Sequence, residues 1–271
     1  MKPRRRRIIP GIVVAALTLL SLPVWLRPAP EPLYRGLTLA EWVQLNETYI
    51  QDLAFYQPAM VALGGSKAIP FYMRELTVRD NPLAERSWAW LEARGSIQRP
   101  RRTAEKRRAS AASFFQILGP GGAPATGEIQ RLLRHPHFEP DARRLLVGVL
   151  GAIGPEAAAA VPDLVHELDT SLSPLVRANS AWALGHIAAE PAVAVPSLCR
   201  ALVGNDALTL AAAAGALGAY GTNSRPALPR LRELAEAANP HSLPAWTGLG
   251  SVRDAARQAL NVIEPSPRVR P

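Results

Sequence analysis

The sequence predicts an all-α fold, a solenoid of stacked helical hairpins preceded by a single N-terminal transmembrane helix. Leu150-Gly151, Leu184-Gly185 and Leu217-Gly218 are each followed at the same distance by a proline, at Pro162, Pro196 and Pro229. These prolines are 34 and 33 residues apart, a period typical of stacked helical repeats. A charge-free apolar run over residues 8–26 predicts the membrane segment.

The N-terminal run is long enough to cross a bilayer. Its 19 residues would make a helix of roughly 28 Å, close to the thickness of the hydrocarbon layer. Basic residues flank it, and Trp25 lies at its far edge, where an indole prefers the interface. We expect residues 1–7 to form a basic cytoplasmic tail, and the chain that follows the membrane segment to be periplasmic. The alternative is a cleaved signal that releases a secreted protein, although no Ala-x-Ala site follows the run.

A proline-rich linker is expected over residues 27–37. Thr38 and Glu41 have the spacing of a capping box, which predicts a helix beginning at Leu39. The solenoid is expected over residues 38–264, with irregular stretches at 77–107 and 239–250, and a disordered tail over 265–271. Within it, the sequence predicts a hairpin at 52–76, repeats at 141–169, 174–203 and 206–237, and a half-repeat at 251–263.

Each repeat is expected to pair two helices, called helix A and helix B. In the clearest repeat, Ser173 is predicted to cap helix A and Val195-Pro196 to stand in the first turn of helix B. Trp182 aligns with Gly148 and Gly215, so we interpret its indole as compensating for their small size. Cys199, the one cysteine, aligns with Val165 and is interpreted as a small buried apolar residue.

Residues 150–164, Leu-Gly-Ala-Ile-Gly-Pro-Glu-Ala-Ala-Ala-Ala-Val-Pro-Asp-Leu, resemble HEAT repeats, including the short bacterial kind related to phycobilin-lyase repeats. Residues 34–42 resemble the opening of membrane-anchored or exported bacterial HEAT-repeat proteins, and the resemblance extends over 34–264. It implies a right-handed α-α superhelix, of the armadillo type, that binds protein partners on its concave face, where helices B line up.

Arginines supply the candidate binding residues. Arg108, Arg143, Arg177 and Arg253 share one position in helix A, which Leu210 takes in the remaining repeat. Such a row can bind acidic partners or phosphates. It can also pair with acids of the repeats themselves, for which Asp163 is a plausible partner.

A second basic feature is the segment 99–108. Its basic residues are Arg99, Arg101, Arg102, Lys106, Arg107 and Arg108. The formal charge of +9 is concentrated here and in residues 2–27 rather than spread over the solenoid. The segment can touch an anionic membrane surface or remain solvated. Nucleic acid is an unlikely partner because no aromatic residues interleave with the charges.

The sequence offers no catalytic constellation. His135 and His137 have no third ligand at a metal-binding spacing, and His166-Glu167 is a single dipeptide. We therefore expect no catalytic residue, no metal and no cofactor, and a non-catalytic scaffold. One alternative is a HEAT-fold enzyme, either phycobilin-lyase-like or an alkylated-base glycosylase. Another is a protein that binds nucleic acid or anionic lipid through the basic segment 99–108.

Overall fold

The computed structural model describes residues 33–34, 36–38, 65–82, 86, 89–90, 93–94, 103–135, 138–237 and 251–265. All of them belong to Pro32–Pro271, the larger of the two units into which the chain divides. The predicted transmembrane segment, the helix expected at Leu39, the insertion at 239–250 and the tail beyond 265 lie outside the described residues.

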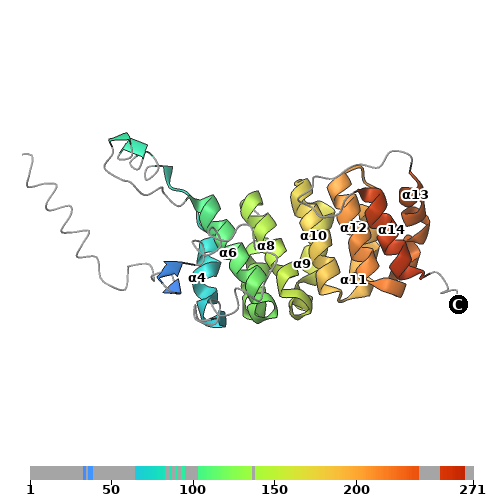
Figure 1. Ribbon diagram of the computed structural model, residues 1–271, viewed down its shortest axis with the longest axis horizontal. Helices are drawn as coiled ribbons and strands as arrows, with labels where there is room; N and C mark the ends of the chain where they lie inside the picture. The colour runs from blue at the N-terminus through green and yellow to red at the C-terminus, as the bar shows by residue number, and fades with distance from the viewer. Residues whose placement is uncertain are drawn as a thin grey trace, which may run out of the picture. The chain divides into compact units, whose positions relative to one another are not determined.

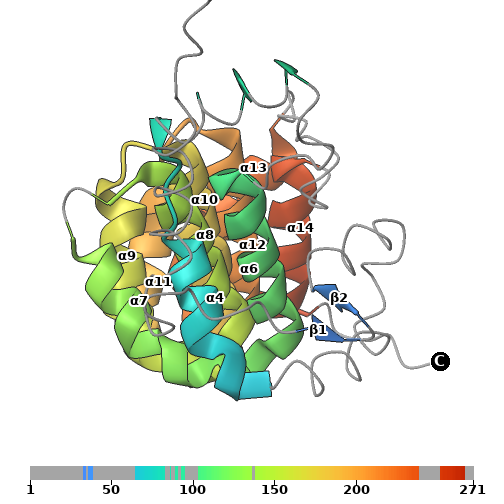
Figure 2. The same ribbon diagram turned by 90° about the vertical axis from the view of Figure 1, so that its left-hand side faces the viewer.

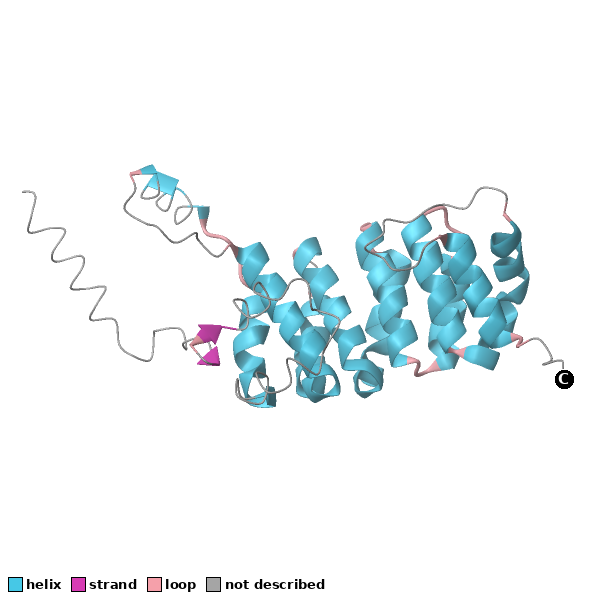
Figure 3. Ribbon diagram, in the orientation of Figure 1, coloured by secondary structure: helices cyan, strands magenta, loops and turns pink. Residues whose placement is uncertain are grey.

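A small β-ribbon precedes the helices. β1 (Leu33–Tyr34) and β2 (Leu37–Thr38) pair in antiparallel fashion, with Leu33 opposite Thr38 and Tyr34 opposite Leu37 (Figure 3). Gly36 lies in the turn with a φ of 78°, a conformation that glycine adopts without strain. The ribbon lies within the predicted linker 27–37 and extends one residue beyond it, because Gly36 lets the chain fold back and pair.

Two rows of helices make up the repeats (Figure 1). Helices A are α6 (Ala104–Leu118), α8 (Pro140–Ile153), α10 (Pro174–Ile187), α12 (Ala207–Ala219) and α14 (Val252–Ile263). Helices B are α4 (Ile69–Leu76), α7 (Thr126–Leu133), α9 (Val161–Thr170), α11 (Pro191–Ala201) and α13 (Leu228–Glu236). Each helix A packs against the next helix A along the chain. In Figure 2, α7, α9 and α11 lie on the opposite side of the stack from α6, α12 and α14. The predicted architecture of helical repeats is thus confirmed, while residues 52–64 of the predicted hairpin 52–76 lie outside the described residues.

One continuous apolar core fills the space between the rows. The leucines of the repeated phrase, Leu150, Leu184 and Leu217, have no exposed surface, and neither do their counterparts on helices B, Leu164, Leu198 and Leu231. Both sets keep the repeat period because each hairpin buries its open face against the next one.

The glycine of the repeated phrase marks close contact between neighbouring helices A. A Cβ atom on Gly185 would lie 2.8 Å from the Cα of Ala216, and one on Gly218 would lie 3.3 Å from the Cα of Ala259. A Cβ atom on Gly151 would lie 3.0 Å from the Cα of Ala183. The spacing therefore leaves no room for a side chain at Gly185 and little room at Gly151 and Gly218. In α6 the aligned residue is Gln116.

Positive-φ residues begin the A-to-B connections. Gly119, Gly154 and Gly221 lead into 3-10 turns, η3 (Gly119–Ala125), η4 (Gly154–Ala160) and η5 (Gly221–Ala227). A similar short turn, η2 (Gly65–Ala68), precedes α4. In the α10–α11 repeat, Ala188 and Glu190 adopt φ values of 49° instead. This turn is shorter than the 3-10 turns of the other repeats, and α11 begins directly after it, at Pro191.

Two local predictions about this repeat are therefore corrected. Val195 and Pro196 do not lie in the first turn of helix B, because α11 begins about one turn earlier. Ser173 stands at the N-cap of α10, but its side chain makes no capping hydrogen bond. By contrast, the Ser251 hydroxyl caps α14 by accepting from the backbone N–H of Asp254 at 3.1 Å.

Among the described residues, Asp141–Thr170 is long and apolar enough to cross a membrane by length and composition. It comprises α8, η4 and α9. Of its most apolar 18-residue window, 56% is buried within the protein, so we attribute its hydropathy to the core.

Candidate binding surfaces

The arginine row caps helix ends. The C-terminal carbonyls of a helix lack intrahelical partners and carry partial negative charge, so a guanidinium stabilises them. Arg143 donates to the carbonyls of Leu133 and His135 at 2.7 and 2.8 Å, at the end of α7. Three further arginines donate to backbone carbonyls in the same way: Arg177 to that of Ser171, Arg108 to that of Val78 and Arg253 to that of Ala237. Each arginine thus caps the C-terminal end of the helix B that precedes it.

Three of these arginines also pair with acids. Arg108 contacts Glu139 at 2.6 Å and Arg177 contacts Asp206 at 3.6 Å; these acids are the N-cap residues of the next helix A. Arg143 pairs with the buried Glu167 of α9. The arrangement favours the structural interpretation, in which the row links consecutive repeats rather than presenting free charge.

The predicted partner Asp163 is wrong for this row. Its carboxylate accepts from Arg134 at 2.7 Å and from Gln130 at 2.7 Å, both on or at the end of α7. The reason is that Asp163, in the first turn of α9, faces the preceding helix B rather than helix A. This ion pair raises the pKa of Arg134.

The capping role persists where Leu210 replaces the arginine. Leu210 is buried, and the carbonyl of Leu202 at the end of α11 accepts from Arg230 Nε of α13 at 3.0 Å instead. A different helix therefore supplies the guanidinium at this repeat.

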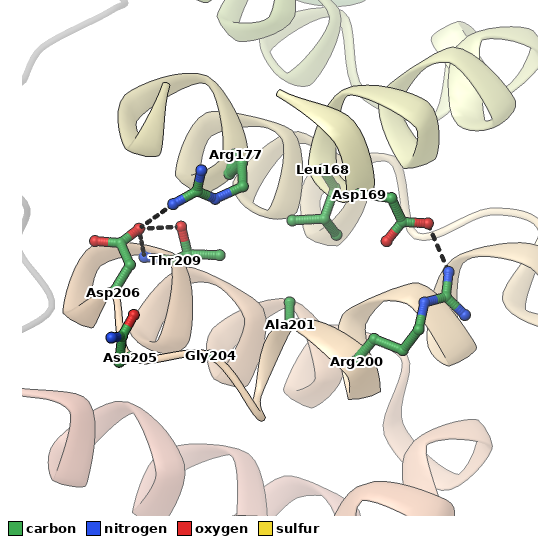
Figure 4. Close-up of a pocket in the computed structure, with 9 residues that line it drawn as sticks. All are labelled: Leu168, Asp169, Arg177, Arg200, Ala201, Gly204, Asn205, Asp206 and Thr209. Atoms are coloured by element: carbon green, nitrogen blue, oxygen red, sulfur yellow. Dashed lines mark hydrogen bonds and ion pairs between the residues drawn. The ribbon is translucent and has the colours of Figure 1, made fainter. Parts of the chain in front are cut away.

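A pocket of about 460 Å³ lies beside Arg177 (Figure 4). Arg177 and Asp206 line one side, and Arg200 pairs with Asp169 at 2.6 Å on the other. Asp206 also accepts from the backbone N–H of Thr209 at 3.3 Å. Hollows of about 640 and 470 Å³ lie beside Arg143 and Arg108, at the same place in earlier repeats. The arginine of this row faces an acid in each of them, so none presents that guanidinium as a free charge.

The basic segment is only partly described, since Arg99, Arg101 and Arg102 lie outside the described residues. Arg107 makes two parallel bonds to Glu75 of α4, at 2.6 and 2.7 Å, and Arg108 is buried against Glu139. Lys106 is exposed on α6. Two of the three described basic side chains thus tie α6 to its neighbours.

A groove of about 540 Å³ crosses the outer surface of helices A. Its lining comes from α6, α8, α10 and α12, and the larger apolar side chains are Leu145, Leu175, Trp182 and Leu208. Its polar side chains are Gln116, Asp141, Arg144 and Asn179. Within the described part of the chain, these four side chains make no hydrogen bond or ion pair with one another or with other residues. The groove therefore differs from the arginine pockets in having polar groups available to a ligand.

Trp182 forms one wall of this groove and is half-buried. A Cβ atom on Gly151 would overlap its indole, so the ring packs on that glycine. The His186 ring contacts the indole at a centroid distance of 4.0 Å, with the two ring planes tilted by 34°. The predicted structural role agrees with this packing, but the predicted glycines are wrong. A Cβ atom on Gly148 or Gly215 would meet nothing within 4 Å, because the indole lies over the following turn of α8.

Sequence reasoning missed the groove. The signal that could have found it is the Gly148–Trp182 alignment, which we interpreted as compensation although the position is an open surface. The same alignment is also consistent with a hollow over Gly148 that is bounded by the Trp182 indole.

Two further side chains pack inside the repeats. Cys199 of α11 is half-buried, as is its aligned residue Val165, and burial raises the pKa of the Cys199 thiol against the opposing effect of Arg200. The Tyr220 hydroxyl donates to the carbonyls of Leu184 and Ala189 at 3.1 and 2.9 Å, which fixes the turn after α10. Burial raises the pKa of Tyr220 to about 12. Among the described residues, no three His, Cys, Asp or Glu side chains gather where a metal could bind.

Comparison with known proteins agrees with this architecture. A search among curated proteins finds no match. A family model for HEAT repeats matches residues 161–261, which span α9 to α14. The matched segment consists of stacked helical hairpins like those of the repeats that precede it, so residues 161–261 are HEAT repeats.

Proposed function

We propose that this protein is a membrane-anchored, non-catalytic HEAT-repeat scaffold that binds protein partners outside the cytoplasm. Repeats of this kind form extended helical surfaces suited to protein interaction. The observation that carries the proposal is the groove on helices A, where apolar side chains lie beside four polar side chains that have no partner among the described residues. Partially apolar surfaces with free polar groups are typical of protein interfaces.

The absence of catalysis is part of the proposal. Perturbed ionisable groups in a cleft are typical of enzymes. Here the raised pKa values of Cys199 and Tyr220 come from burial in the packed repeats, and neither residue lines the groove. The arginine pockets hold ion pairs that connect helices. These features support a structural rather than a catalytic use of the charged residues.

The proposed location depends on residues 8–26 and their basic flanks. Fusions of alkaline phosphatase and of green fluorescent protein after residue 37 test the orientation. We expect phosphatase activity and no fluorescence, since the fused domain would be exported. Carbonate extraction separates an uncleaved anchor, which stays in the membrane pellet, from a released protein.

Two faces of the stack are candidate partner surfaces. The family resemblance favours the concave face, along helices B. There, Arg134–Asp163 and Arg200–Asp169 join successive helices B as partly exposed ion pairs. The groove lies instead on helices A. Partner binding by each face is therefore tested with a separate variant.

A pull-down from detergent-solubilised membranes tests partner binding. The bait is the full chain, compared with Arg134→Glu/Arg200→Glu on helices B and with Gly148→Leu on helices A. We expect wild type to retain proteins that one of the two variants loses. Equal recovery by bait and empty resin would refute the scaffold proposal.

A further inference from the structure

We propose that the groove on helices A binds an extended peptide segment of a partner protein, anchored by one bulky apolar side chain beside Trp182. The inference rests on the proposed function, and it names the surface and the chemistry of the partner.

The length of the groove suits a peptide. Its lining comes from four successive helices A, α6 to α12. Packed helices lie about 8–10 Å apart, so the groove extends over roughly 25–30 Å. An extended chain advances about 3.3 Å per residue, so roughly eight or nine residues would fill it.

The anchor position is the hollow beside the indole. A Cβ atom on Gly148 would meet nothing within 4 Å, so space is open over α8 next to Trp182. The indole is held by its contacts with Gly151 and His186. A pre-positioned aromatic wall loses little entropy on binding, which is typical of residues that dominate interface energies.

The polar side chains match a peptide backbone. Gln116 and Asn179 each carry a primary amide that both donates and accepts hydrogen bonds. Peptide groups alternate N–H and C=O and need both kinds of partner. Asp141 and Arg144 stand one turn apart on α8 with opposite charges, so the groove has no net charge. A polyanion would need unopposed cations, whereas a peptide of mixed charge complements this pair.

The test uses the full chain in detergent micelles and a displayed library of random 12-residue peptides. The best-enriched peptide is synthesised, and its Kd is measured by Trp fluorescence and calorimetry. The decisive variant is Gly148→Leu, which fills the hollow. Gly215→Leu is the matched control, because it makes the same change at a helix A position outside the groove lining where a Cβ atom would also meet nothing within 4 Å. Circular dichroism checks that both variants keep their helices.

We expect the enriched peptides to share one aromatic or large aliphatic residue. Gly148→Leu should weaken binding at least tenfold, and Gly215→Leu should change it less than twofold. No enrichment, or equal binding by Gly148→Leu and wild type, would overturn the inference. A concentration-dependent dimer that only Gly148→Leu abolishes would also overturn it, since a second copy would then occupy the groove.

The pull-down distinguishes a failure of the groove inference from a failure of the scaffold function. If wild type and Gly148→Leu recover the same partners, the scaffold function holds and the groove inference fails. If neither recovers a partner, the function itself fails.

Discussion

Replacing Gly185 by alanine should force α10 and α12 apart. The new Cβ atom would lie 2.8 Å from the Cα and 3.0 Å from the Cβ of Ala216. Carbon atoms pack best at about 3.5–4.0 Å, so the helices would have to separate by roughly 0.5–1 Å. The obstructing atoms belong to backbone and to a Cβ atom, neither of which can rotate away.

The expected cost follows from two opposing terms. Overpacking a well-filled contact costs about 1–3 kcal/mol. Alanine favours a helix interior over glycine by about 1 kcal/mol. Gly185→Ala should therefore lower the free energy of unfolding of the repeats by up to about 2 kcal/mol. Gly215→Ala is the matched control, because its Cβ atom would meet nothing within 4 Å and only the helix preference remains. It should stabilise by about 0.5–1 kcal/mol.

Urea unfolding of the full chain in micelles, followed by circular dichroism at the helix band, measures the effect. Repeat arrays can unfold in more than one step, so transition midpoints are compared directly. The two variants should shift the midpoint in opposite directions. A Gly185→Ala midpoint at or above that of Gly215→Ala would refute the idea that glycine sets the helix spacing.

Three further predictions use the same unfolding assay. Ala188→Gly should raise the midpoint, by an amount equivalent to about 1 kcal/mol, because Ala188 has a φ of 49° that glycine adopts without strain; no gain would contradict this account of the turn. Arg143→Met should destabilise by about 3 kcal/mol, since it leaves the carboxylate of Glu167 buried without its partner, and Arg143→Met/Glu167→Gln should recover part of the loss. Tyr220 has a pKa raised to about 12, so the unfolded chain releases this proton at a lower pH than the folded chain does. The contribution of Tyr220 to the free energy of unfolding should be complete below pH about 10. It should decline as the pH rises towards 12, at up to about 1.4 kcal/mol per pH unit. In Tyr220→Phe that part of the decline should be missing.

Much of the architecture was readable in the sequence because repeat periodicity is a local property. The spacing of Leu150, Leu184 and Leu217 predicted which face of each helix A is buried, since a helix presents every third or fourth residue on one side. The prolines at 162 and 229 marked the first turns of their helices B, because proline tolerates that position. At Pro196 the same rule failed, because the left-handed turn at Ala188 and Glu190 lets the helix begin earlier.

Contacts between repeats were decided only by the tertiary structure. The sequence aligned Trp182 with Gly148, but the indole packs on Gly151; it offered Asp163 to the arginine row, but that carboxylate faces α7. Such pairings depend on the separation and rotation of neighbouring hairpins, which the local pattern of one hairpin does not encode. The sequence by itself determined that helical hairpins recur and which side chains fill their core. The stacking of one hairpin on the next decided which arginines are neutralised. It also decided where a groove forms whose polar groups have no partner among the described residues.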